Sequence, residues 1–80
     1  MKLFIIDSQN VSKPINIMES DTVAKLKEEI KKKNNIVGDI ELVFDGDILN
    51  DNDLLFKLEI KDGMSINYLG IYNAGLSPKI

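Results

Sequence analysis

Alternation of apolar and polar positions begins at the second residue and predicts a strand over residues 2–7. Leu3 and Ile5 share one face of this segment, and Phe4 and Ile6 share the other, because successive side chains of a strand point to opposite faces. A strand with one buried face is therefore expected at the start of the chain.

A second strand follows after a polar turn. Residues 8–10 are Ser-Gln-Asn, which is typical of a turn, and residues 14–17 resume the alternation. Strand, turn and strand at this spacing indicate a β-hairpin. Pro14 favours a sheet edge or a bulge, because proline cannot donate to a strand ladder.

The clearest helical pattern covers residues 22–35. Val23, Leu26 and Ile30 recur at helical spacing and form one narrow apolar stripe. Thr22 is a favourable N-cap, and Asn35 can adopt the left-handed conformation that often ends a helix. The pattern predicts an amphipathic helix with one buried face.

Charged residues on this helix also follow its spacing. Glu28 with Lys32 and Glu29 with Lys33 are i,i+4 pairs in the favourable order. The three lysines at 31–33 gather at the end where the helix dipole is negative. We interpret this run as a solvated helix end, in preference to a patch for nucleic acid or lipid.

The second half of the chain contains shorter elements. Residues 40–44 and 65–69 alternate as strands, and residues 48–49 form a short apolar piece after an Asp-Gly-Asp turn. Residues 54–60 are typical of a helical turn followed by a core residue. The resulting order, β-β-α-β-β-(short helix)-β, predicts an α+β fold with a mixed sheet over one main helix.

Composition then excludes several classes of function. The chain has 80 residues, a formal net charge of −3, and neither cysteine nor histidine. The length fits one domain, and the negative charge disfavours a nucleic-acid binder. Without cysteine or histidine, the usual nucleophile–base pairs and zinc sites cannot be built, so we expect no enzyme.

No segment is long and apolar enough for a signal peptide or a membrane span. We expect a monomeric intracellular protein, cytoplasmic or nuclear.

Four aspartates within residues 45–53 suggest a calcium loop at first sight. A calcium loop needs oxygen ligands at alternating positions. Leu49 occupies such a position when the count starts at Asp45, and Leu55 does when it starts at Asp51. We therefore interpret the aspartates as acidic surface turns and expect no metal or cofactor.

Four stretches of the chain resemble ubiquitin: MKLFI, ESDTVAKLKEEI, LVFDG and GDILNDNDLLFKLEIKDGMSINYL. The match runs without a gap through Asp39, has one residue fewer just after it, and ends near residue 69. In detail the chain is more similar to ubiquilin-type integrated ubiquitin-like domains, mainly because Asp-Gly precedes the last strand. The resemblance implies a β-grasp fold at residues 1–70, no catalytic activity, and a role in protein degradation or modification. Residues 71–80 would be a flexible tail or the start of a linker.

The resemblance also implies which residues form the core and which bind partners. The implied core consists of Leu3, Ile5, Ile15, Ile17, Val23, Leu26, Ile30, Leu42, Leu49, Leu55, Ile60 and Ile66. The family binds partner helices on the exposed sheet face through an apolar triad and its surroundings. At these positions Val43 and Leu69 keep the aliphatic character, Gly46 keeps a turn glycine, Ser8 replaces a leucine, and Asn67 replaces a histidine.

Strand alternation adds Ile6 to this surface, since it faces outward if Leu3 and Ile5 face the core. Ubiquitin has a lysine at the position of Ile6. The apolar patch is therefore predicted to be shifted and enlarged, with proteasome subunits or ubiquitin-binding helical motifs as partners. The alternative is that these aliphatics are scattered surface residues without a role.

Charged positions differ from ubiquitin as well. Asp45 and Asp47 stand where ubiquitin has an alanine and a lysine, which favours basic partners. Asp47 and Asp62 occupy the positions of two lysines used for ubiquitin chains, so the chain is a poor platform for ordinary polyubiquitin. Lys27 keeps a structural position, and Asp51 is its expected ion-pair partner.

The last residues decide between two further hypotheses. Ubiquitin ends in Arg-Leu-Arg-Gly-Gly, whereas residues 71–75 here are Ile-Tyr-Asn-Ala-Gly and five residues follow. In one alternative the protein is a ubiquitin-like modifier that is cleaved after Gly75 and conjugated by partner enzymes. In another it is a structural subunit whose sheet face is permanently covered in a complex. A tail or linker is the simpler interpretation.

Overall fold

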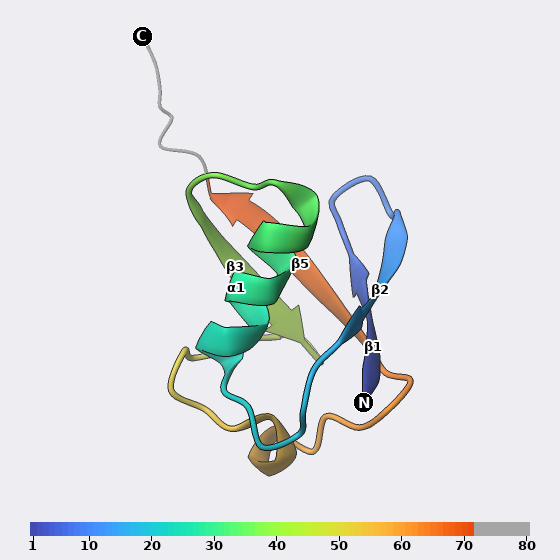
Figure 1. Ribbon diagram of the computed structural model, residues 1–80, viewed down its shortest axis with the longest axis vertical. Helices are drawn as coiled ribbons and strands as arrows, with labels where there is room; N and C mark the ends of the chain where they lie inside the picture. The colour runs from blue at the N-terminus through green and yellow to red at the C-terminus, as the bar shows by residue number, and fades with distance from the viewer. Residues whose placement is uncertain (72–80) are drawn as a thin grey trace, which may run out of the picture.

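The computed structural model describes residues 1–71 and shows a five-stranded mixed sheet with one helix packed on one face (Figure 1). The strand order is β2-β1-β5-β3-β4, with β1 and β5 parallel and the other neighbours antiparallel. The elements are β1 (Lys2–Ile6), β2 (Ser12–Asn16), α1 (Val23–Asn34), β3 (Asp39–Phe44), β4 (Asp47–Ile48), the 3-10 helix η1 (Leu55–Leu58) and β5 (Ser65–Ile71). The predicted α+β, β-grasp architecture and its element order are confirmed.

The first hairpin forms around an aspartate turn. The Asp7 carboxylate accepts hydrogen bonds from the backbone N–H groups of Gln9 and Val11, both at 2.9 Å. Such a side chain replaces a backbone turn partner and fixes the chain reversal. Asn10 takes a positive φ of 65° within this turn, a conformation that asparagine tolerates better than most residues.

Pro14 lies on an edge strand, as predicted, and makes no bulge. The β1–β2 register is continuous, with Pro14 opposite Phe4. The N–H of Phe4 donates to the carbonyl of Met64 at 3.0 Å, on the β5 side of β1. Phe4 and Pro14 therefore form a non-hydrogen-bonded pair, and the proline nitrogen faces the free edge of the sheet. A residue without an N–H is tolerated at this position.

Both predicted ends of the helix are confirmed. The Thr22 hydroxyl accepts a hydrogen bond from the N–H of Lys25 at 3.2 Å. At the other end, Asn35 has a φ of 55°, and its N–H donates to the carbonyl of Lys31. Side-chain and backbone groups thus satisfy donors and acceptors that a helix end leaves free.

The two predicted ion pairs on the helix were wrong. Within the described residues, Glu29 contacts Lys25 at 3.4 Å and Lys32 at 3.9 Å. Lys33 instead donates to the carbonyl of Pro14 at 2.8 Å. An outward-facing carbonyl on the edge strand therefore competes with the carboxylate of Glu29 for this ammonium group, a contact that helix spacing alone cannot indicate.

One apolar core lies between the helix and the sheet. Every predicted core residue is buried, and Ile40 joins them. Ile40 was missed, although it alternates with the buried Leu42 along β3. The loops that close the core are joined by backbone hydrogen bonds, including those from Val23 to Asp53 at 2.9 Å and from Leu55 to Asp21 at 3.0 Å.

The turn between β3 and β4 positions the outer surface of the sheet. Asp45 and Gly46 have φ values of 55° and 85°, as a two-residue type I′ hairpin turn requires. This turn sets Phe44 opposite Asp47 and Val43 opposite Ile48. At its other side β3 pairs with β5, which continues to Ile71 and is two residues longer than predicted. None of the helices in residues 1–71 is long and apolar enough to cross a membrane.

Candidate protein-docking surface

The sheet has one face covered by α1 and one outer face. On the outer face, strand register brings four residues from four neighbouring strands into one line. Ile6 of β1 pairs with Asn67 of β5, Asn67 pairs with Val43 of β3, and Val43 pairs with Ile48 of β4. We call these four residues, Ile6, Asn67, Val43 and Ile48, the sheet-face row.

Exposure varies along the row, and Asn67 is exposed between two half-buried neighbours. Ile6 and Val43 are half-buried, whereas Ile48 is 60% exposed. Leu69, two residues beyond Asn67 on the same face of β5, is 48% exposed. Directly opposed and diagonal neighbours in a sheet lie within reach of aliphatic side chains. The row and Leu69 therefore offer apolar surface on both sides of one polar residue, Asn67.

Four of the six predicted partner-binding residues meet on this face: Ile6, Val43, Asn67 and Leu69. Gly46 lies in the β3–β4 turn, beyond the end of the strand that carries Val43. Ser8 is exposed in the first hairpin turn and belongs to a different feature. The structure thus separates the predicted set into a sheet face, a neighbouring turn and one outlying serine.

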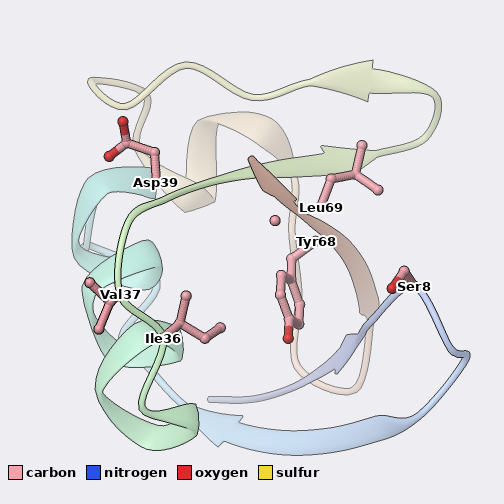
Figure 2. A pocket seen from close by; sticks show the side chains of 7 residues that line it. Ser8, Ile36, Val37, Asp39, Tyr68 and Leu69 are labelled. Carbon is pink, nitrogen blue, oxygen red and sulfur yellow. The ribbon is translucent and has the colours of Figure 1, made fainter. Parts of the chain in front are cut away.

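Ser8 lines a small hollow of about 190 Å³ at the end of β5. Figure 2 shows Tyr68 and Leu69 between Ser8 and the loop at residues 36–39. Leu69 is shared, since it borders this hollow and lies on the outer face. Ser8 is therefore connected with the sheet face through Leu69, without belonging to the row.

Ile48 is the surface residue that sequence reasoning missed. It stands directly opposite Val43 across the hairpin, and its neighbour Leu49 is buried. The signal was present in the sequence VFDGDI, because a two-residue Asp-Gly turn fixes which residues oppose each other. Residues 45–47 were assigned to one turn, and the pairing of Ile48 with Val43 was therefore not predicted.

Lys27 links the helix to the loop and to the sheet. Its ammonium group contacts Asp51 at 2.6 Å, as predicted, and also contacts Glu41 at 3.1 Å. Burial alone would lower the pKa of Lys27, but the hydrogen bonds and charges of Asp51 and Glu41 outweigh it and raise the pKa above 10.5. This contact stabilises the fold and leaves Lys27 only 14% exposed.

Aspartates follow or precede the end residues of the row along the chain. Asp7 follows Ile6 directly, and Asp45 and Asp47 flank the turn beside the other end of the row. Lys2 is the lysine on the outer face of β1, four residues from Ile6, or about 13 Å along the strand. Within residues 1–71, no group of three or more His, Cys, Asp or Glu side chains is placed to hold a metal ion.

Comparison with protein families agrees with this geometry. Residues 1–68 match the family described as Ubiquitin-2 like Rad60 SUMO-like. The chain belongs to this ubiquitin-like family. No curated protein matches it significantly. Ubiquitin-like domains are generally non-catalytic. The family match supports the predicted ubiquitin-like fold, while the finer similarity to ubiquilin-type domains stays a prediction. The predicted conjugation terminus of this ubiquitin-like domain, Gly75, lies outside the described residues.

Proposed function

We propose that this ubiquitin-like domain is a non-catalytic binding module that docks partner proteins on the outer face of its sheet. One observation carries the proposal: the sheet-face row and Leu69 present aliphatic side chains on a face opposite to the helix. Contiguous exposed apolar surface marks interaction sites more often than scattered aliphatics do.

The proposed partners are intracellular proteins of the ubiquitin–proteasome pathway, in the cytoplasm or the nucleus. Proteasome subunits and ubiquitin-binding helical motifs are the candidates, because family members bind through the corresponding face. A face of this size supports weak and reversible contacts. No metal or cofactor is needed for such docking, and the domain would supply no chemistry of its own.

The experiment compares two charge-matched variants of the full chain. Leu69→Asp places a carboxylate on the outer face, and Met18→Asp places one at a residue that is 64% exposed after β2. With purified proteasomes immobilised on a sensor surface, we expect Leu69→Asp to weaken binding about tenfold or more and Met18→Asp to change it less than about twofold. Circular dichroism should show the same fold for both variants.

Two results would contradict the proposal. Equal binding by wild type and Leu69→Asp would move the docking site away from the outer face. Absence of proteasome binding by the wild-type chain would remove the proposed pathway. Recovery from cells of a chain whose intact mass corresponds to cleavage after Gly75 would favour the modifier hypothesis instead. Copurification with one fixed partner at high salt would favour the structural-subunit hypothesis.

A further inference from the structure

Two Asp-Gly dipeptides occur in the chain, Asp45–Gly46 between β3 and β4 and Asp62–Gly63 before β5. We propose that Asp45–Gly46 is a site at which the chain converts spontaneously to isoaspartate, and that the fold protects the same dipeptide at residues 62–63. The isoaspartyl carboxylate would be a substrate for a methyltransferase that transfers a methyl group from S-adenosylmethionine to carboxylates. This modification is independent of the proposed docking function.

Isoaspartate forms at an Asp-Gly dipeptide through a cyclic succinimide. The backbone nitrogen of Gly46 attacks the Cγ carbon of the protonated Asp45 side chain and loses its proton, and one carboxyl oxygen leaves as water. Glycine favours this attack because no Cβ shields its nitrogen. Water then opens the succinimide. Opening between the nitrogen and Cγ restores aspartate, whereas opening between the nitrogen and the main-chain carbonyl carbon gives isoaspartate. Water is released once and consumed once, so no other reactant is needed.

Both dipeptides are open to solvent, so exposure does not distinguish them. All four residues are exposed. Both glycines have a positive φ, 85° for Gly46 and 89° for Gly63. Apart from the neighbours in the chain, no heavy atom lies within 4 Å of the place where a Cβ would stand on either glycine. A succinimide ring therefore has room at each dipeptide, and any difference in reactivity must arise from hydrogen bonding.

Lys2 binds both reacting groups of the second dipeptide. Its backbone N–H donates to Oδ1 of Asp62 at 2.7 Å, and its carbonyl accepts a hydrogen bond from the N–H of Gly63, also at 2.7 Å. Lys2 itself is held in β1 by pairing with Asn16 of β2. Attack of the Gly63 nitrogen on the Asp62 side chain would have to break both hydrogen bonds. Loss of two ordinary hydrogen bonds raises the barrier enough to slow the step about tenfold or more.

Asp45–Gly46 lacks this protection. Among residues 1–71, no hydrogen bond or ion pair engages the Asp45 carboxylate or the N–H of Gly46. A two-residue hairpin explains the unused N–H, because its cross-turn hydrogen bond joins the flanking residues, here Phe44 and Asp47. The two groups that must meet at residues 45–46 can therefore react without first breaking a contact.

Isoaspartate at position 45 would change the hairpin. It carries the main chain through the side chain and adds one carbon to a two-residue turn whose geometry fixes the register of β3 and β4. β4 has two residues and lies at the edge of the sheet, with β3 as its neighbour. The modified turn would therefore release Ile48 from its place opposite Val43. Methylation of the new carboxylate offers a way back, since renewed attack by the Gly46 nitrogen expels methanol and regenerates the succinimide.

Ageing of the full chain in its folded and unfolded states tests the inference. The protein is incubated in mildly acidic buffer with and without guanidinium chloride, and peptide mapping measures isoaspartate at each dipeptide. In the unfolded chain the two dipeptides should react at rates within about threefold of each other, whereas in the folded chain position 45 should react about tenfold faster than position 62 or more. A second set of amide resonances from Val43 and Ile48 should grow as isoaspartate accumulates.

Glutamate variants are the matched controls, because glutamate would have to form a larger ring and reacts much more slowly. Glu59 has a φ of 61° in this chain, so Asp45→Glu suits the backbone of the turn. Transfer of labelled methyl groups by a purified isoaspartyl methyltransferase should fall about tenfold for aged Asp45→Glu and less than about twofold for aged Asp62→Glu. The same ratio of the two sites with and without denaturant, more isoaspartate at position 62 than at 45, or none at position 45 of the folded chain would each overturn the inference. Unchanged resonances of Val43 and Ile48 in aged protein would overturn the effect on the hairpin.

Discussion

At the scale of single residues, Lys27 shows how one side chain can join three elements. It projects from α1, meets Asp51 in the loop before η1, and meets Glu41 on β3. The lysine is mostly buried, whereas Asp51 is 60% exposed. The contact is therefore stronger than an ordinary surface ion pair but remains partly screened by water.

Replacing Lys27 with methionine should lower the free energy of unfolding by about 1–2 kcal/mol near neutral pH, because the packing stem remains but both charged hydrogen bonds are lost. The folded state raises the pKa of Lys27 above 10.5. Its stabilising effect is therefore fully present below the pKa of the unfolded chain and disappears as pH rises through the folded value. Urea denaturation of both proteins between about pH 7 and pH 12 should show the difference shrinking above 10.5.

Lys25→Met is the matched control for this measurement. Lys25 makes a surface pair with Glu29 at 3.4 Å and is 48% exposed, so its loss should cost less than about 0.5 kcal/mol. Equal costs for the two variants, or a Lys27→Met difference that does not change with pH, would mean that the ion pairs of Lys27 contribute little to stability.

Contacts between residues that are close in sequence could largely be predicted from the sequence. The Thr22 cap and the Asn35 C-cap depend on groups within one turn of the helix, and both were predicted. The Lys33 contact with Pro14 and the Glu41 contact with Lys27 join residues distant along the chain. The relative position of these distant segments depends on the fold, so neither contact was predicted.

At the scale of elements, β2 shows how a sheet edge is protected. Ser12, Pro14 and Asn16 turn their backbone groups away from β1, and the central one lacks an N–H. Lys33 reaches from α1 and occupies the carbonyl of Pro14 at 2.8 Å. Edge strands with unpaired backbone groups pair with other chains, so proline and lysine here disfavour association through β2.

The double variant Pro14→Thr with Lys33→Ala should expose that edge. Threonine restores the donor and favours strand conformation, and alanine frees the carbonyl. Sedimentation velocity over about a hundredfold range of concentration should show a sedimentation coefficient that rises more steeply for the double variant than for wild type. Lys33→Ala alone keeps Pro14 and should resemble wild type. Identical behaviour of all three proteins would show that the edge is protected by other means.

The same scale explains what was predictable about the outer face. Alternation within each strand correctly predicted that Ile6, Asn67 and Leu69 face outward, since period 2 is a local property, and the resemblance to ubiquitin added Val43. Their order across the sheet depends on register between strands that are distant in sequence. The outward position of Ile48 was not predicted, because β4 has only two residues and two residues are too few to show an alternating pattern.

At the scale of the whole molecule, charge is unevenly distributed. Three lysines, at residues 31–33, end the helix, whereas Asp7, Asp45 and Asp47 lie in or next to the turns between β1 and β2 and between β3 and β4. The net charge of −3 understates this separation. Attraction between oppositely charged surfaces speeds the encounter of two proteins. This charge distribution should therefore act mainly on the rate at which partners associate.

Binding to immobilised proteasomes should therefore depend on salt mainly through the association rate. Between about 20 mM and 300 mM sodium chloride we expect the association rate to change more than about threefold and the dissociation rate less than about twofold, because screening weakens steering at long range but not apolar contact at close range. Binding kinetics recorded on the sensor surface measure both rates. An association rate that stays constant at every salt concentration would mean that the charges do not steer the encounter, and that the aliphatic side chains alone select the partner.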